Sequence, residues 1–275
     1  PDLLSIEGLA RAYSSWIGDK TGLREYFVQK SDYKVEINEK TQSVRPFFVT
    51  AILKNIEFDD ALIRSLIQVQ EKLHITHGRK RRKVAIGIHD LSVVEFPVTY
   101  TTKPGTYQFQ PLGEEVEKTV DWMLNEMKTG VEYAWILDGH DEYPMIHDNK
   151  GMVLSMPPII NSEHTRVNEF TAELFVDITG TDLKAITEVL NVICTMFADR
   201  GAEIHEVHNH YPDGSVMTTP NLKPWEMELD NRYVNKTLGM EFTPEESLAE
   251  LEKMGHSGTV VWNIIKTHIP CYRPD

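Results

Sequence analysis

The stretch ELFVDITGTDLKAITEVLNVICTMFADRG, residues 173–201, predicts a strand, a turn and a long helix in succession. The apolar run at 173–178 is the strand, and Gly201 stops the helix. Asp177 interrupts this strand, so its carboxylate is expected to be half buried and to need a partner. A purely structural alternative is that Asp177 and Thr179 only cap the helix after the turn.

The segment before this strand, SMPPIINSEHTRVNEF at 155–170, is too stiff for an ordinary solvated loop. Its double proline fixes two φ angles and removes two backbone donors, so it cannot be a central strand. Two isoleucines follow, and then six consecutive polar residues at 161–166. The residues alone therefore support a rigid polar pocket and leave its substrate open.

Length and composition indicate one or two domains with real cores, because the chain has 275 residues of which 41% are hydrophobic. The formal net charge of −14 repels nucleic acid, so any RNA contact has to be local. RKRRK at 79–83 is a local exception that runs straight into the buried-strand pattern VAIGI. These five basic residues form either a solvated face or a phosphate-reading site.

Cysteine usage and hydropathy bear on the compartment. Cys194 and Cys271 lie far apart, which argues against a disulfide framework and favours a reducing cytoplasm. The chain has no apolar run of about 18 residues and no N-terminal signal pattern, so a soluble cytoplasmic protein without membrane contact is expected. Neither end has the polar character usual for a natural terminus, and we expect a fragment of something longer.

The rest of the sequence predicts short strands and helices. After Pro220 the pattern consists of two short helices and one strand, which together make a small module. Gly130 is expected to end the third helix, and Thr243 with Glu246 forms a capping box at the start of the last one. Because this small module follows Pro220, we expect two domains, at 1–221 and 222–275. We expect helices at 3–16, 59–74, 114–128, 229–238 and 244–254, strands at 33–37, 45–53, 84–88, 96–102 and 260–267, and hairpins that turn at 148–151 and 212–214.

Several kinds of site are excluded by the motifs that the sequence lacks. It has no GxxxxGK, GxGxxG or CxxC, and Ser155 does not stand in a glycine-flanked nucleophile elbow. His205, His208 and His210 are poorly spaced for a metal, because only residues two apart share a face of a strand. No metal site is expected.

Two motifs, VLSMPPIINSEHTRV at 153–167 and LFVDITGTDL at 174–183, strongly resemble the editing domain of the phenylalanyl-tRNA synthetase β subunit of the archaeal/eukaryotic type. Further matching pieces run in order along the chain: PDLLSIEGLARA, LIQVQEKLH, GRKRRKVAIGIHDL, FQPLGE and YPMIHDNKGMVLSM. The closing part, from WEMELDNRYVNKTLG to IPCYRPD, is similar to the next domain of that subunit. The resemblance covers nearly the whole chain.

The resemblance implies an α+β fold, with a three-layer α/β editing domain around a β-sandwich-like core and a small winged-helix-like α+β module after it. It implies part of an aminoacyl-tRNA ligase β chain, here a deacylase that removes tyrosine wrongly esterified to phenylalanine tRNA. A pocket shaped for phenylalanine cannot strongly exclude a ligand that only adds a hydroxyl. A second site that hydrogen-bonds the phenol can discriminate, because phenylalanine would leave its polar groups unpaired.

The matching positions also imply catalytic roles. Ser155, Asp177 and Thr179 are the expected catalytic residues. Asp177 would read the tyrosine hydroxyl, and the two hydroxyl groups would hold the ester or its water. The favoured chemistry is direct attack by a positioned water, with His164 as an alternative base.

Other positions are implied to contact the rest of the substrate. Ile146 and Asn161 would bind the substrate together with Asp177, and the tRNA contacts near the pocket entrance would be Gln70, Arg81 and Arg82.

The implied partners are phenylalanine tRNA and the α subunit, in a heterotetramer of two α and two β chains. No cofactor is expected in this fragment, because ATP and magnesium belong to the whole enzyme. Two other interpretations stay open. One is a non-catalytic module that positions the tRNA or the α subunit, and the other is an isolated binding protein for an aromatic amino acid.

Overall fold

A computed structural model describes residues 1–273 and divides them into two compact units. The larger unit is residues 28–220, and the smaller one joins residues 1–27 to the segment after Pro220. The sequence predicted residues 1–27 in the first domain, together with the rest of 1–221. In the structure they belong instead to the smaller unit. Pro274 and Asp275, the end of the expected small domain, lie outside the described residues. No helix within 1–273 is both long enough and apolar enough to cross a membrane.

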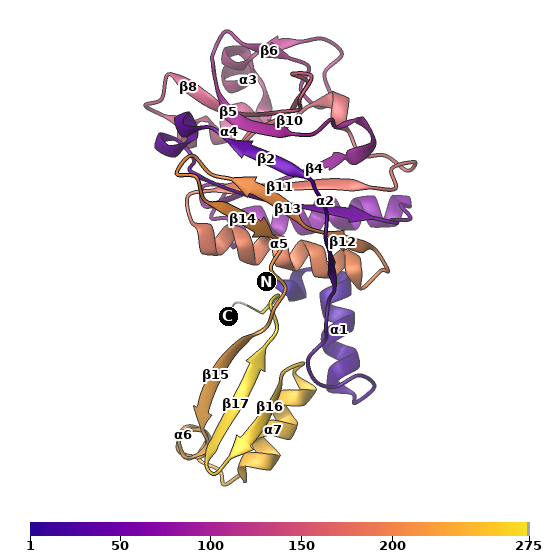
Figure 1. The fold of residues 1–275 in the computed structure, drawn as a ribbon, viewed down its shortest axis with the longest axis vertical. Helices are drawn as coiled ribbons and strands as arrows, with labels where there is room; N and C mark the ends of the chain where they lie inside the picture. The colour runs from indigo at the N-terminus through magenta and orange to yellow at the C-terminus, as the bar shows by residue number, and fades with distance from the viewer. Residues whose placement is uncertain (274–275) are drawn as a thin grey trace. The chain divides into compact units, whose positions relative to one another are not determined.

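The larger unit is built on a five-stranded sheet with the order β1-β12-β3-β11-β4. β11 lies antiparallel between β3 and β4, and all seven of its residues are buried. Helices α2 (Asp60–Ile75) and α5 (Leu183–Ala198) pack against this sheet (Figure 1). The strands are β1 (Val28–Gln29), β12 (Glu203–His205), β3 (Phe47–Lys54), β11 (Leu174–Gly180) and β4 (Val84–Asp90).

A seven-stranded sheet forms the next layer, with the order β10-β9-β8-β5-β2-β13-β14. Phe48, Ile52 and Phe175 of the first sheet share one buried cluster with Tyr100 and Leu154 of the second. Helices and two sheets thus make three layers around a sandwich-like core, which confirms the expected α+β fold. The strands are β10 (Ile160–Asn161), β9 (Val153–Met156), β8 (Glu142–His147), β5 (Val98–Pro104), β2 (Lys34–Ile37), β13 (Val207–His210) and β14 (Val216–Thr219).

The helix expected at 114–128 is wrong in its bounds, because two short helices stand there. α3 (Val120–Glu126) begins only after Thr119, whose side chain accepts from a first-turn amide, and α4 (Lys128–Tyr133) follows. Gly130 lies inside α4 and does not end a helix. A Cβ at that position would lie 1.7 Å from the Met123 carbonyl oxygen, so glycine allows the two helices to approach. The smaller elements of this unit are β6 (Gln108–Phe109), β7 (Lys118–Thr119), η2 (Glu39–Ser43), η3 (Leu91–Val93), η4 (Ala134–Leu137) and η5 (Glu163–Thr165).

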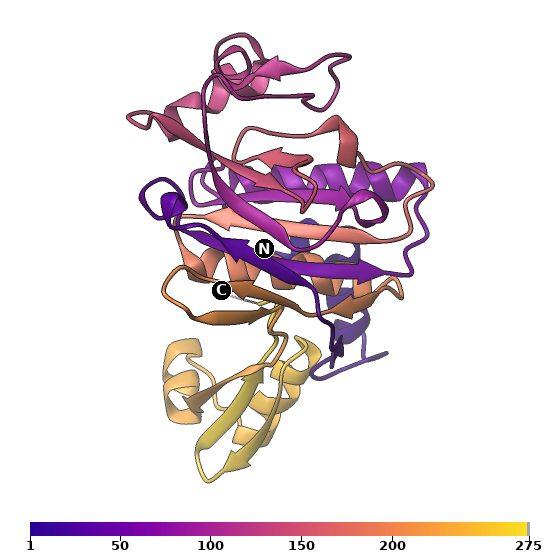
Figure 2. The same ribbon diagram turned by 45° about the horizontal axis from the view of Figure 1, so that its top comes forward.

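The smaller unit holds a three-stranded antiparallel sheet with the order β15-β17-β16, seen with helices α6 and α7 in Figure 2. The expected capping box of Thr243 and Glu246 is confirmed at the start of α7. The single strand expected at 260–267 is a hairpin, and a strand occupies the start of the helix expected at 229–238. The elements are η1 (Asp2–Leu4), α1 (Ile6–Trp16), β15 (Trp225–Asp230), α6 (Asn231–Leu238), α7 (Pro244–Lys253), β16 (Ser257–Val261) and β17 (Ile264–Ile269).

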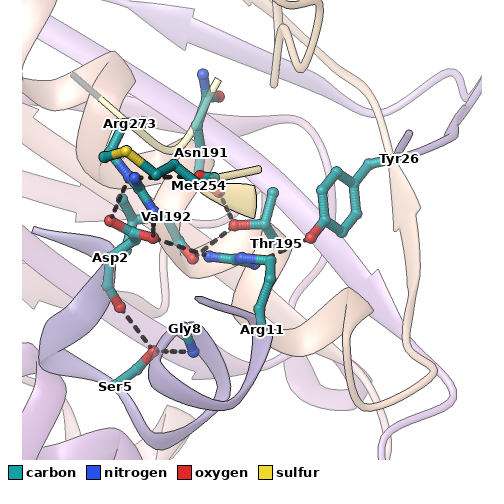
Figure 3. Close-up of polar contacts among 10 residues, drawn as sticks. All are labelled: Asp2, Ser5, Gly8, Arg11, Tyr26, Asn191, Val192, Thr195, Met254 and Arg273. Atoms are coloured by element: carbon teal, nitrogen blue, oxygen red, sulfur yellow. Dashed lines mark hydrogen bonds and ion pairs between the residues drawn. The ribbon is translucent and has the colours of Figure 1, made fainter. Parts of the chain in front are cut away.

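Buried charges explain why the N-terminal residues belong to this unit (Figure 3). The Arg11 guanidinium lies 3.6 Å from the Tyr272 ring centre and donates to the Tyr26 hydroxyl at 2.9 Å. Arg273 Nε lies 3.4 Å from the carboxylate of Asp2, which is buried. Burying a carboxylate is unfavourable unless it is paired, so these contacts hold the two ends of the chain together.

Candidate functional site

A cavity of about 250 Å³ opens in the larger unit beside β4 and β10, the end strands of the two sheets. We call it the edge cavity. Its walls come from α2, β4, α4, the segment from Ser155 to Asn161, and Asp177 of β11. The volume is slightly below the usual range for small-molecule sites, about 300–1,000 Å³, and therefore suits a group the size of one amino-acid side chain.

Asp177 lies in the wall of the edge cavity and is only 1% exposed, so the expectation of half burial is wrong. The expectation of a partner is confirmed: Asp177 Oδ2 lies 2.6 Å from Nε2 of the fully buried His89. The other ring nitrogen of His89 lies 2.8 Å from Thr165 Oγ1. The capping alternative is wrong, because the side chain of Asp182 caps α5 by accepting from Ala185 N–H.

Two hydroxyl groups of the edge cavity have no hydrogen-bond partner among residues 1–273. They are Ser155 Oγ on β9, where the residue is 2% exposed, and Thr129 Oγ1 on α4. Buried polar groups in native proteins are nearly always hydrogen-bonded. Two such groups in the wall of one cavity therefore point to a polar ligand.

The double-proline wall of the edge cavity is held by Arg81. Its Nη1 donates to the carbonyls of Pro158 and Ile159 at 3.2 and 3.1 Å, and its Nη2 donates to Glu71 at 2.7 Å. The guanidinium also lies 4.6 Å from the Tyr133 ring centre. The rigid segment expected from the two prolines is thus held in place by the side chain of Arg81, which belongs to the basic run at 79–83.

Glu71 joins this clamp to a buried histidine of the same helix. His74 Nε2 accepts from the backbone N–H of Ile86 at 2.9 Å, so the ring proton stands on Nδ1, 3.3 Å from Glu71. Burial lowers the pKa of His74, which keeps the ring neutral. The hydrogen bond from His74, followed by the charge of Arg81, lowers the pKa of Glu71 to about 2.

Gln70 and Asn161 line the edge cavity and also protect the edge of β4. Gln70 Nε2 donates to the Ile86 carbonyl at 2.7 Å, and Asn161 Nδ2 donates to the Ile88 carbonyl at 3.4 Å. With His74 on the Ile86 amide, side chains satisfy backbone groups that an end strand would otherwise leave open.

Other expected site residues lie away from the cavity wall. Ile146 is fully buried in the core between the sheets, because its side chain faces the apolar cluster. The Thr179 hydroxyl is also buried and accepts from Arg45 Nε at 2.8 Å. Arg82 and His164 are exposed and do not line the edge cavity.

Arg45 is a buried residue of this region that the sequence did not single out. Its guanidinium donates to the Thr179 carbonyl and to the carbonyls of Arg81 and Arg82, at 2.8, 3.1 and 3.0 Å. Burial lowers its pKa to about 10, so it remains charged at neutral pH. Arg45 therefore holds the turn at 79–81, where three consecutive residues have a positive φ. No local pattern marks Arg45, because its partners lie at least 36 residues away.

In the described part of the chain, no group of three or more His, Cys, Asp or Glu side chains could hold a metal ion. His208 contacts Thr218 Oγ1 and the Ser31 carbonyl.

Comparisons with known proteins agree along the whole chain. It is 45% identical over 275 residues to the phenylalanine–tRNA ligase β subunit of Archaeoglobus fulgidus, and 41% identical over 277 residues to that of Pyrococcus furiosus. It covers 50% of each of these proteins, so it spans about half the length of the curated relatives it matches. No family model matches the chain.

A solved structure gives the same result for the fold. It is an N-terminal fragment of the phenylalanyl-tRNA synthetase β subunit from Pyrococcus horikoshii, with a TM-score of 0.96 and 39% identity. The match covers 100% of this chain and 79% of that one. The chain therefore belongs to the family of the phenylalanine–tRNA ligase β subunit, archaeal type.

Proposed function

We propose that this chain is the proofreading part of a phenylalanine–tRNA ligase β subunit and that it hydrolyses tyrosine esterified to phenylalanine tRNA. The observation that carries the proposal is the edge cavity itself, which is lined by the buried carboxylate of Asp177 and by two hydroxyls without partners among residues 1–273. Its size suits one aromatic side chain, and its polar groups suit the phenol and the ester.

Asp177 is proposed to select the substrate. One carboxylate oxygen is held by His89, and Oδ1 makes no hydrogen bond to residues 1–273, so it can accept the phenol O–H. Phenylalanine brings no donor and would leave this buried acceptor unpaired. Sites that hydrogen-bond a substrate hydroxyl reject the analogue without it by about 10⁴-fold or more.

Hydrolysis is proposed to proceed by direct attack of water on the ester. Water adds its oxygen to the carbonyl carbon of tyrosine, the bond to the ribose oxygen breaks, and one proton of the water passes to that ribose oxygen. Ser155 Oγ is the group proposed to hold the water or the ester carbonyl, because it has no other partner within 1–273. Thr179 acts in this proposal through Arg45 and the turn, and not on the substrate.

The rigid wall supports this chemistry. Double proline and the Arg81 clamp hold the segment from Pro157 to Asn161 before a ligand arrives, so binding loses little conformational freedom. Arg82, exposed beside this clamp, is proposed to contact phosphates of the tRNA. The α subunit is the proposed protein partner, in an α₂β₂ enzyme of the cytoplasm in which ATP and magnesium serve the whole enzyme and not this chain.

The test is deacylation of tyrosyl and phenylalanyl esters of phenylalanine tRNA by the 275-residue chain. We expect selective release of tyrosine, strong loss with Asp177→Ala and a partial loss with Ser155→Ala, each measured at a temperature below the unfolding transition of that variant. Equal release from the two esters contradicts the selection by Asp177. No release from either one favours a module that only positions the tRNA or the α subunit.

A further inference from the structure

His89 is a buried titratable residue that takes no step in the hydrolysis proposed above. It is fully buried on β4 and touches Asp177 Oδ2 with one ring nitrogen and Thr165 Oγ1 with the other. Thr165 Oγ1 also lies 3.4 Å from the Leu154 carbonyl oxygen. A line of two side chains, His89 and Thr165, thus reaches Asp177 from the core side of the edge cavity.

The space for this line is built into the neighbouring strand. Gly87 pairs with Asp177 across the sheet and stands two residues before His89, so both project to the same face of β4. A Cβ at Gly87 would lie 2.1 Å from Asp177 Oδ2 and 2.8 Å from His89 Nε2. Any side chain at position 87 would therefore displace the carboxylate or the ring.

We propose that His89 is a positioning residue that gives Asp177 its specificity for a phenol. A carboxylate has two oxygens that can each accept. With Oδ2 held by the ring at 2.6 Å, Oδ1 is the oxygen left without a partner among residues 1–273, and its position is set by the rigid sheet. The site then accepts one hydroxyl donor at one distance along the aromatic axis. This inference rests on the proposed function.

Without His89, the position of the Asp177 carboxylate would no longer be fixed. Its buried Oδ2 would lack a partner, and the side chain would turn to satisfy it or admit water. Discrimination between tyrosine and phenylalanine would then fall, because neither oxygen would be reserved for the phenol. A merely structural pair would instead contribute to folding and leave the discrimination unchanged.

The experiment measures binding of free L-tyrosine and L-phenylalanine to the 275-residue chain by calorimetry, for the wild type and four variants. His89→Leu removes the donor, whereas His89→Gln can keep an N–H near the position of Nε2. Thr165→Val removes the group behind the ring. The matched control is Thr50→Val, because Thr50 is buried, pairs with Asp177 across the sheet and bonds Asn209 outside the edge cavity.

We expect His89→Leu to lower the preference for tyrosine at least about tenfold, the loss of one buried hydrogen bond of about 1.4 kcal/mol or more. His89→Gln should restore most of it, Thr165→Val should give a smaller loss, and Thr50→Val should give none. A wild-type preference that persists in both His89→Leu and Thr165→Val overturns the role of His89 alone. A wild type that prefers neither amino acid overturns the proposed function and this inference with it.

If His89→Leu does not fold, His89→Gln and Thr165→Val decide. The ring N–H signal of His89 in the nuclear magnetic resonance spectrum is a second readout, since it needs no ligand. It should be strongly deshielded in the wild type and should move on Asp177→Asn. A signal that is insensitive to Asp177→Asn contradicts the pairing.

Discussion

Arg81 of the basic run has two possible roles, a contact with the tRNA and a clamp on the wall of the edge cavity. The variant Arg81→Ala distinguishes them. The family resemblance assigns Arg81 to the tRNA, whereas its side chain is only 13% exposed and both of its terminal nitrogens, Nη1 and Nη2, already donate to protein acceptors. If it is chiefly a clamp, its loss should loosen the wall at Pro158 and Ile159. Arg82→Ala is the matched control, because it removes the same charge from an exposed neighbour.

The magnitude follows from the contacts. Two hydrogen bonds from a charged donor to largely buried carbonyls contribute about 1 kcal/mol each, and the stack on Tyr133 adds about 0.5–1 kcal/mol. The pair with Glu71 is discounted to about 0.5 kcal/mol, because the Glu71 side chain is 44% exposed. We expect Arg81→Ala to lower the free energy of unfolding by about 3 kcal/mol and Arg82→Ala to change it by less than about 0.5 kcal/mol.

Urea denaturation measures the global effect, and amide hydrogen exchange of the peptide at 156–161 measures the wall directly. Exchange in this peptide should rise in Arg81→Ala and stay unchanged in Arg82→Ala. The salt dependence of tRNA binding is the complementary readout, since each lost phosphate contact reduces its slope by about 0.7–0.9. Equal stabilities with an altered slope in Arg81→Ala would refute the clamp and return Arg81 to the tRNA.

Three further changes probe the surroundings. Arg45→Met leaves three carbonyls and a hydroxyl without their buried donor, so the free energy of unfolding should fall by about 3–5 kcal/mol in urea; a loss below about 1 kcal/mol contradicts this. The lowered pKa of Glu71 means that its stabilisation is complete above pH 4.5 and disappears as the pH falls toward about 2, so unfolding measured against pH should lose this dependence in Glu71→Gln. Thr243→Ala should cost about 1 kcal/mol at the capping box, seen as faster amide exchange in the first turn of α7, with the exposed Thr237→Ala as control.

Sequence reasoning found the elements whose signals are local. The hairpin turns at 148–151 and 212–214, the buried strand before Gly180 and the capping box at Thr243 follow from turn chemistry and from short apolar runs. β15 and β16 were missed because most of their residues are exposed or half-buried, so no alternation marks them. A two-faced exposed strand has no periodic signal in a single sequence.

The same holds for the candidate site: features with a local sequence signal could be expected, and contacts between distant residues could not. The stiff wall and the need of Asp177 for a partner could be expected from 155–170 and 173–178, whereas its full burial could not. The partner itself could not, because His89 meets Asp177 only through the register of β4 against β11. Arg81 was noticed for its charge, but the two carbonyls that it holds, those of Pro158 and Ile159, lie 77 residues or more along the chain.

Whether the phenol is read by a hydrogen bond is the central claim, and one ratio tests it most directly. The rates of deacylation by the wild-type chain should be compared for phenylalanine tRNA that carries tyrosine and for the same tRNA that carries 4-fluorophenylalanine. The two side chains are similar in size, but only tyrosine can donate to Asp177. We expect tyrosine to be released faster by about 10³-fold or more, and the ratio to collapse in Asp177→Ala. Similar rates for the two esters in the wild type would show that the edge cavity selects by size and would contradict the account.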